Sequence, residues 1–593
     1  MAGQGQLGRD PLQLRPARSE EDVRRIAPGV AGRLRTQPGS HRFPAEAERG
    51  KADLRHHDAG AGGQCAAAAR AGRRGAVQRA GGEGDEGERR GGERSVFVRA
   101  AASGRVAVAG GCTLQGCRIG GAGQGGGEGD HGTVEIGGGG VMRRLLLALI
   151  AAVAVMQVSA QIRHGAPLIE FNDDGGWCWF EDERAIASGG KLVFGTIATG
   201  GARQGHVEAT VYDLKSRETK RVTLHTPTDE RDRRQWTDDH NSPAFLPLPS
   251  GEILTMYAKH GPEEKIYYRI SKPGDPADWG EEQVFVPSPA SRVTYSNLHF
   301  LTSENAGRGR IYDFYRGFNN SFKPSFAWSD DLGRTWTAGG VFIDVPTKFR
   351  HRPYVKYASN GRDAVHFAYT DGHPRDFNNS IYHAVYRAGD LMASSGARIG
   401  SMREGLKAPE EGTLVYKGGP DNVAWITDLE LDSKGRPYMV FSVQMNSAGK
   451  PDGEGGEDHR YHYARFDGKR WQVAEIAYAG TRIYAREDDY TGLAALHPRD
   501  PGTIYISTNA DPVTGAPLIS RADNQRHWEI YRGRTRDGRR WKWEAITRDS
   551  TADNLRPVVP APDSGQTILL WLQGKMRSYT DYTFRVVGMI GKR

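Results

Sequence analysis

Three short segments place histidine beside Tyr, Arg, Gly or Pro in otherwise strand-like surroundings. His240 lies in Asp238–Pro243 before an expected strand, and His260 follows the next strand. His373 lies in Tyr369–Arg375. An imidazole, with a usual pKa of about 6.5, can take up or release a proton near neutral pH. These segments are candidates for acid–base chemistry, although a single His at a strand end often only stabilises a turn.

Tyrosine and arginine recur between these histidines. Tyr295 follows Thr294, Arg316 precedes Gly317, and Arg352 and Tyr354 flank Pro353. A guanidinium is always charged and can hold a carboxylate through two hydrogen bonds. A tyrosine, with a usual pKa of about 10, needs a neighbouring cation before it can act as a base at neutral pH. Such distant residues can form one site only if the fold brings strand ends and turns together.

The elements that would position these residues are short strands. From Ile169 onward, strand-like runs are separated by Gly, Pro, Asn and Asp, and no long amphipathic helix pattern interrupts them. Early examples are Lys191–Thr196, Val207–Tyr212, Ile253–Ala258 and Ile266–Ile270. Regular short strands with turn signals indicate an all-β sandwich, barrel or propeller.

Repeated turns select the propeller. Ser329–Trp336 fits the Asp-box pattern Ser-x-Asp-x-Gly-x-Thr-Trp, and degenerate versions occur at Phe466–Trp471 and Thr535–Trp541. Pro276–Trp279 is a further candidate for a turn at a blade end. A Trp-bearing turn every roughly fifty to seventy residues is typical of four-stranded blades. We therefore expect a seven-bladed β-propeller, with six or eight blades as alternatives, in which the Asp box is structural.

The first part of the chain differs from the rest. Residues 1–141 are rich in Gly and Arg, are of low complexity and cannot bury a core, so they indicate a disordered leader or a misassigned start. Residues 142–160 resemble a signal peptide, with basic Met142–Arg144, apolar Leu145–Met156 and a cleavage site after Ala160. The apolar stretch is shorter than the roughly 20 residues of a spanning helix, so we expect secreted or periplasmic protein without stable membrane insertion.

The remaining residues, 161–593, form the expected catalytic propeller domain. The formal net charge of +8 carries little weight because arginine is concentrated in the leader. Cys178 is the one cysteine of this domain, which excludes an intramolecular disulfide, and its neighbours Trp177 and Trp179 favour a packed core thiol. The sequence shows no phosphate-cradling or nucleic-acid-binding motif. We expect a monomer without a nucleic-acid partner.

Several segments of residues 165 to 590 resemble the BNR-repeat propeller family. They are Trp177–Arg184, the His240 and His260 pair, Phe314–Gly317, Thr370–Pro374 and Asp553–Pro557. That family includes seven-bladed polysaccharide lyases that act on ulvan and on rhamnose-glucuronate linkages. The resemblance implies an acidic, uronate-containing polysaccharide as substrate and its cleavage by β-elimination.

The resemblance also implies roles for individual residues. His240, His260, Tyr295 and Arg316 would surround the uronate at the cleavage point, while Arg352, Tyr354 and His373 would line the cleft for substrate binding. Removing the proton at C5 of a uronate places negative charge on its carboxylate. A cation in contact with that carboxylate, such as Arg316, would stabilise this state. His240 and Tyr295 would be base and acid, in either order.

No cofactor is required for this chemistry. The spacing of the histidines matches no compact zinc motif. If the protein binds a divalent metal, we therefore expect that metal to be structural and not catalytic. Two other functions remain open. A sialidase-like glycoside hydrolase also uses Asp boxes on a propeller, but needs an arginine cluster and a Tyr nucleophile. A non-catalytic glycan-binding propeller is the second alternative, because a fold does not determine function.

Overall fold

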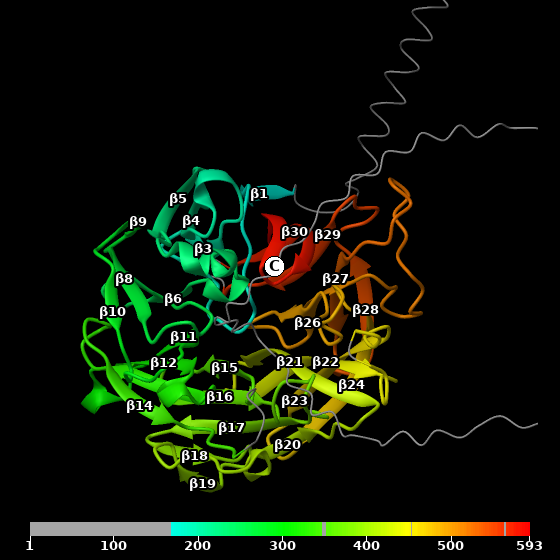
Figure 1. Cartoon of the computed structure of the whole chain (residues 1–593). Helices are drawn as coiled ribbons and strands as arrows, with labels where there is room; N and C mark the ends of the chain where they lie inside the picture. The colour runs from blue at the N-terminus through cyan, green and yellow to red at the C-terminus, as the bar shows by residue number, and fades with distance from the viewer. Residues whose placement is uncertain (1–167, 347–351, 452, 562–564, 593) are drawn as a thin grey trace, which may run out of the picture. The chain divides into compact units, whose positions relative to one another are not determined.

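The computed structural model describes residues 168–346, 352–451, 453–561 and 565–592, which form seven antiparallel sheets arranged as the blades of a propeller (Figure 1). The predicted all-β class and the blade number of seven are confirmed. The predictions for residues 1–141 and 142–160 lie outside the described residues. In the described part of the chain, the helices are short 3-10 turns, and none has the length and apolar character of a membrane-crossing helix.

The first four blades follow the chain from residue 185 to residue 416. Blade 1 contains β2 (Ala185–Ser188), β3 (Lys191–Ile197), β4 (Val207–Asp213) and β5 (Thr219–His225). Blade 2 contains β6 (Ala244–Pro247), β7 (Ile253–Tyr257), β8 (Ile266–Lys272), β9 (Asp275–Trp279) and β10 (Gln283–Phe285). Blade 3 contains β11 (Thr294–Leu301), β12 (Arg310–Arg316), β13 (Pro324–Ser329) and β14 (Thr337–Val341). Blade 4 contains β15 (Val355–Ser359), β16 (Ala364–Tyr369), β17 (Ile381–Arg387), β18 (Asp390–Met392), β19 (Arg398–Ser401) and β20 (Thr413–Tyr416).

Three more blades complete the ring. Blade 5 contains β21 (Asn422–Leu431), β22 (Pro437–Met445), β23 (His459–Phe466) and β24 (Trp471–Gly480). Blade 6 contains β25 (Ala494–Leu496), β26 (Thr503–Thr508), β27 (Glu529–Thr535) and β28 (Trp541–Ala545). Blade 7 contains β29 (Asp553–Val558), β30 (Gln566–Ser578), β31 (Asp581–Lys592) and β1 (Ile169–Asn172). The 3-10 turns are η2 (Gly201–Arg203), η3 (Glu230–Gln235), η4 (Asp239–Asn241), η5 (Asn305–Gly307), η6 (Phe318–Asn320) and η7 (Pro409–Glu411).

The ring closes by pairing the two ends of the described chain. Strand β1 adds to β31, with Ile169 opposite Gly588 and Glu170 opposite Val587. The last blade is therefore built from both ends of the domain, and no blade is left without a neighbour on either face. Closure protects apolar sheet faces that a single blade would expose to water.

The apolar core lies between neighbouring blades. Leu254 and Met256 of β7, for example, pack in one buried cluster with Leu298 and Ile311 of blade 3. Similar clusters join the other neighbouring blades. A sheet covered on both faces reads as a nearly continuous apolar run, which is why β7 (Ile253–Tyr257) is buried throughout.

The predicted Asp box forms a turn between β13 and β14. Asp331 Oδ1 accepts hydrogen bonds from the backbone amides of Arg334 at 3.1 Å and Thr335 at 2.9 Å, and Ser329 Oγ accepts one from Gly333. The Trp336 ring lies 6.3 Å from that of Tyr268 in blade 2. The structural role of this motif is confirmed.

One predicted turn is wrong. Pro276–Trp279 belongs to strand β9, which pairs with β8 after a tight turn at Gly274. The proline is accommodated because β9 lies off the main path of its sheet, where an absent amide interrupts no central ladder.

Candidate active site

Blades 2, 3 and 4 each present two of the predicted site residues at the same end of the propeller. One residue of each pair lies at or shortly before the start of the blade's first strand, and the other lies at or shortly beyond the end of its second strand. The pairs are His240 and His260, Tyr295 and Arg316, and Tyr354 and His373. Because these two strands are antiparallel, the start of one and the end of the next share an edge, and three neighbouring blades thereby converge on one mouth.

The carboxylate of Asp238 contacts both histidines of blade 2, and Asp239 Oδ1 lies 2.8 Å from His240 Nδ1. The imidazoles of His240 and His260 are stacked, with ring centroids 4.0 Å apart and planes within 5°. Asp238 Oδ1 lies 2.7 Å from His240 Nδ1, and its Oδ2 lies 3.0 Å from His260 Nδ1. The same side chain caps η4 (Asp239–Asn241) by accepting the His240 amide. A carboxylate on Nδ1 favours a proton there and leaves Nε2 as the nitrogen for proton exchange.

The charges around His240 favour its protonated form. Burial lowers the pKa of His240, but Coulombic interactions with Cys178, Tyr295, Asp238 and Asp239 raise it to well above the usual value. Because Cys178 and Tyr295 keep their protons at neutral pH, the two carboxylates are the charges that act there. Burial raises the pKa of Asp238, yet His260 and His240 outweigh it and keep the carboxyl ionised. The histidine pair therefore carries its own buried counterion.

Tyr295 and Arg316 face the histidines from blade 3. A β-bulge between Thr294 and Asn297 gives Tyr295 a φ of 65°, and its ring centroid lies 5.5 Å from that of His240. Its hydroxyl is buried and has no hydrogen-bond partner among the described residues. The Arg316 guanidinium lies 4.5 Å above the Tyr295 ring.

Arg316 also contacts the histidine pair, since its Nη2 lies 3.4 Å from His260 Nε2. The neighbouring cations expected for Tyr295 are present, but burial has the larger effect and raises the pKa of Tyr295 well above 10, while His240 and Arg316 lower it only in part. Tyr295 therefore keeps its proton at neutral pH.

The residues predicted to line the cleft adjoin these four. The Tyr354 ring lies 5.3 Å from the Arg316 guanidinium and 5.5 Å from the His373 ring. His373 Nδ1 accepts a hydrogen bond from the Arg375 amide, so Nε2 carries the proton of the neutral ring. Arg352 lies two residues before Tyr354 and is partly buried.

Sequence reasoning missed Tyr579. It lies in the turn between β30 and β31, and its ring packs edge-on against the stacked imidazoles, 5.3 Å from His240 and 6.0 Å from His260. Its carbonyl accepts a hydrogen bond from the Asp239 amide. Nothing in the local pattern separates this turn tyrosine from others, because only ring closure brings blade 7 beside the loop before blade 2.

Three further buried groups, Arg556, Glu181 and Cys178, lie close to Asp239 and His240. Arg556 Nη1 donates to Asp239 Oδ2 at 2.5 Å and also to the carbonyl of Trp177. Burial raises the pKa of Glu181 to about 8 and that of Cys178 to about 11. Cys178 is fully buried and stays a thiol, which confirms its prediction as a packed core residue.

Two groups of side chains have the composition of a metal site. They are Cys178 with Asp239 and His240, and Asp238 with His240 and His260, and in each group the candidate ligand atoms lie within 4.8 Å of one another. In the second group, both histidines use Nδ1 to hold Asp238. A metal bound through those atoms would replace the hydrogen bonds that orient the imidazoles.

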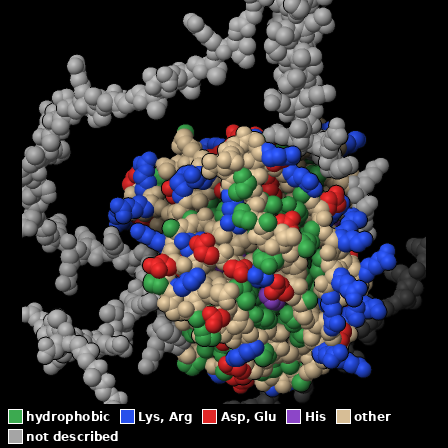
Figure 2. All heavy atoms as spheres, turned by 90° about the vertical axis from the view of Figure 1, so that its right-hand side faces the viewer, with side chains coloured by type: hydrophobic (Ala, Val, Ile, Leu, Met, Phe, Trp, Pro, Cys, Tyr) green, Lys and Arg blue, Asp and Glu red, His purple; other side chains and the backbone are tan. Residues whose placement is uncertain are grey.

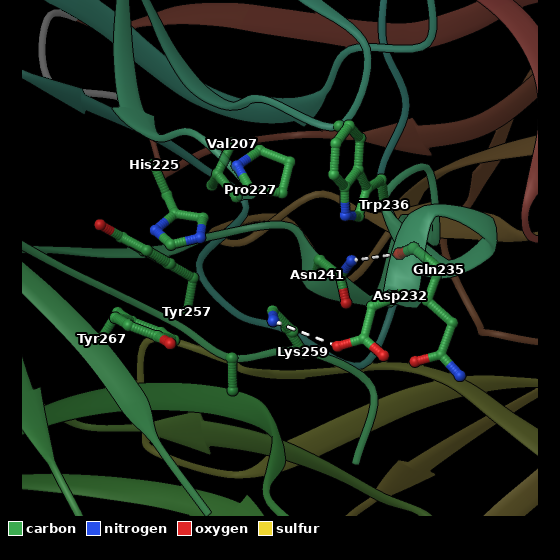
Figure 3. A pocket seen from close by; sticks show the side chains of 12 residues that line it. Val207, His225, Pro227, Asp232, Gln235, Trp236, Asn241, Tyr257, Lys259 and Tyr267 are labelled. Carbon is green, nitrogen blue, oxygen red and sulfur yellow. Dashed lines mark hydrogen bonds and ion pairs between the residues drawn. The ribbon is translucent and has the colours of Figure 1, made fainter. Parts of the chain in front are cut away.

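A small hollow, with room for about 20 Å³ of water centres, lies beside the histidine pair, between blades 1 and 2 (Figure 3). Its apolar walls include Trp236 and Tyr257, and Lys259 reaches into it, 3.5 Å from Asp232. Asn241 lines the hollow and accepts the backbone amide of His260 through its side-chain oxygen. Asn241 is thus part of the wall of the hollow and also holds the backbone of His260 in place.

Residues 201–479 match the model of a family described as BNR repeat-containing family member. The seven blades and the Asp-box turn agree with this match. The chain is therefore similar to BNR repeat-containing proteins over these residues. No curated protein sequence matches the chain.

Solved structures share this fold. A PL25 ulvan lyase bound to -[GlcA(1-4)Rha3S]- aligns with a TM-score of 0.53 at 14% identity, over 72% of this chain and 96% of the other. A second structure of a PL25 ulvan lyase gives a TM-score of 0.51 at 15% identity over the same shares of the two chains. A Hadza microbial sialidase aligns with a TM-score of 0.31 at 11% identity, over 64% of this chain and 66% of the other.

Proposed function

We propose that this protein is a polysaccharide lyase that cleaves an acidic, uronate-containing polysaccharide by β-elimination. The observation that carries the proposal is the grouping of His240, His260, Tyr295 and Arg316 at one mouth, with a cation next to two proton-exchanging groups. The similarity to ulvan lyases in fold supports the same reaction class.

Arg316 would bind the uronate carboxylate. Its Nη2 lies 3.4 Å from His260 Nε2, so a carboxylate between the guanidinium and this imidazole could contact both. When the C5 proton leaves, negative charge spreads onto the carboxylate, and a fixed cation in a buried site stabilises that charge strongly. Arg352 and His373 would help to hold the flanking sugars.

His240 would act as the base and Tyr295 as the acid. The pKa values of both groups are raised, and we assign the base to His240 because an imidazole ordinarily loses its proton at lower pH than a phenol. His240 would take the proton from C5, a C4–C5 double bond would form as the C4–O4 bond breaks, and Tyr295 would give its proton to the departing O4. His260 and Tyr579 would keep the His240 ring in place.

No cofactor takes part in this mechanism, and a metal near Asp238 would have a structural role. We further propose that the protein is secreted or periplasmic and acts as a monomer on polymer outside the cytoplasm.

The deciding experiment follows ultraviolet absorbance while the purified protein acts on ulvan, gum arabic and other polyuronates, since elimination creates a conjugated C4–C5 double bond. A rise in absorbance together with new chain ends supports the lyase. New reducing ends without a rise would establish a glycoside hydrolase instead. Binding without any chain cleavage across the panel would establish a glycan-binding propeller.

A further inference from the structure

The outer hairpin of blade 6 concentrates positive charge. Strands β27 and β28 and the turn that joins them expose Arg534, Arg536, Arg539, Arg540 and Lys542. Figure 2 views the side of the propeller that includes this blade, and Lys and Arg side chains gather along one edge of it. We name these five residues, with Lys469 and Arg470 of the neighbouring turn in blade 5, the blade 6 basic surface.

Cross-strand pairing shows that this charge is not internally balanced. Arg532 lies opposite Glu544, and their side chains form an ion pair of 2.5 Å. Two pairs further along, on the same face of the sheet, Arg534 lies directly opposite Lys542, and no carboxylate of the described residues forms an ion pair with either. Like charges facing each other across a strand pair cost stability, which an anionic ligand would relieve.

The acidic residues of the two turns are already occupied. Asp537 accepts the backbone amides of Arg539 at 2.9 Å and Arg540 at 2.8 Å. Asp467 accepts the backbone amides of Lys469 at 2.8 Å and Arg470 at 2.9 Å. The carboxylates therefore shape the turns, and the basic side chains are exposed, although Arg470 Nε also lies 3.9 Å from Asp467 Oδ2.

The two turns form one continuous surface. Arg539 Nη2 donates to Gln472 Oε1 at 2.9 Å and so links blade 6 to blade 5. A hollow of about 620 Å³ opens between them, with Arg436, Arg465 and Arg539 among its lining residues. Asp467 and Asp537 also line this hollow, and Arg436 and Arg465 share the carboxylate of Asp432. A chain-like ligand that crosses from one turn to the next would therefore meet chiefly the exposed cations of the two turns.

This surface lies at the opposite end of the blades from the candidate active site. The site residues occupy the starts of first strands and the ends of second strands, and the next strand of each blade begins at that end. Turns between third and fourth strands, such as β27–β28 and β23–β24, therefore lie at the other end. A polymer bound there would leave the active-site mouth accessible.

We infer that the blade 6 basic surface binds an anionic polysaccharide, through sulfate or carboxylate groups, at a site separate from the catalytic mouth. Arginine forks match such groups with two hydrogen bonds. Single-stranded nucleic acid would also need an aromatic face for stacking. Trp541 does not offer one freely, because it packs edge-on against Tyr463 at 5.2 Å and on Trp543 at 6.0 Å.

The test measures binding of the full chain to dextran sulfate by calorimetry, with neutral dextran and a DNA duplex as comparison ligands. The double variant Arg536→Glu with Arg540→Glu removes two cations of the surface. The matched control, Lys215→Glu with Lys220→Glu, makes the same charge change at exposed positions in blade 1.

We expect the blade 6 variant to bind dextran sulfate at least roughly tenfold more weakly than the wild type, while the control stays within about twofold. Equal losses in both variants, or no loss in the blade 6 variant, would overturn the inference. Tighter binding of DNA than of dextran sulfate would overturn the polysaccharide assignment. Since elimination is not measured here, the result stands apart from the fate of the proposed lyase activity.

Discussion

At the scale of single residues, the carboxylate of Asp238 determines how the histidine pair can work. It accepts both Nδ1 protons, so neither imidazole can rotate without losing a hydrogen bond to a buried charge. Tyr295 contrasts with this arrangement, because its hydroxyl is buried without a partner among the described residues. A polar group left unsatisfied in this way costs stability and is expected where a substrate will supply the missing partner.

Replacing Tyr295 by Phe should separate catalysis from stability. We expect turnover to fall by about 10²- to 10⁴-fold, because the acid is lost, while the melting temperature stays the same or rises. Tyr315→Phe is the matched control, since it removes another buried hydroxyl without a described partner in the next strand. Elimination kinetics and thermal unfolding of both variants would check this, and equal activity in Tyr295→Phe and wild type would exclude Tyr295 as the acid.

The pH dependence of kcat/KM should report His240. A base must be deprotonated, and the pKa of His240 is raised, so the rate should climb with pH through a value above the usual 6.5. Asp238→Asn removes a negative charge that raises this pKa, so the ascending limb should move to lower pH and the maximum rate should drop about tenfold.

The control for that profile is Asp213→Asn, which alters a carboxylate in the β4–β5 turn of blade 1. Its pH profile should match the wild type. An unchanged limb in Asp238→Asn would assign the titrating group to a residue other than His240.

At the scale of elements, the site depends on how the second strand of each blade ends. Arg316 is the last residue of β12, and Gly317 follows it with a φ of 119°. A Cβ on Gly317 would lie 1.9 Å from the carbonyl oxygen of Arg292. The guanidinium that would bind the uronate is therefore placed by a glycine that allows two backbones to approach closely.

Gly317→Ala should displace Arg316. Positive φ alone costs an alanine about 1–2 kcal/mol, and the clash with Arg292 adds to this. The matched control is Gly340→Ala, whose φ of 109° imposes similar strain but whose Cβ would meet open space. Urea unfolding should show a larger loss of stability for Gly317→Ala, accompanied by a loss of activity that Gly340→Ala does not show. Equal unfolding free energies would contradict the proposed close approach.

At the scale of the whole propeller, ring closure joins the site to the last blade. Arg556 of β29 holds Asp239 beside the histidines, and the turn at Tyr579 covers their rings. Both residues belong to blade 7, which is completed by β1 from the other end of the described chain. Loss of closure should therefore damage the site as well as the fold.

Arg556→Ala should be strongly destabilising. It would leave the buried carboxylate of Asp239 without its cation, which typically costs about 3–5 kcal/mol. Arg585→Ala in the same blade breaks an ion pair with Glu170 that is about half exposed, and such pairs contribute about 0–1 kcal/mol. Chemical unfolding of the two variants would check this difference. Similar losses of unfolding free energy would show that the buried pair of Arg556 with Asp239 stabilises the fold no more than the exposed pair does.

The sequence by itself determined the architecture and most of the candidate site residues. Short apolar runs, turn residues and the box at Ser329–Trp336 are local signals, because strand formation and turn geometry depend on neighbours in the chain. They predicted the propeller, and the structure brings His240, His260, Tyr295 and Arg316 together as expected.

Only the tertiary structure decided how those residues are held and charged. That Asp238 bridges two imidazoles, that Tyr579 covers them and that burial outweighs the cations near Tyr295 all depend on contacts between segments far apart in the chain. Burial and electrostatic coupling are properties of three-dimensional surroundings, and spacing along the sequence does not encode them locally. The pairing of Arg534 with Lys542 likewise follows from strand register, which the hairpin fixes only on folding.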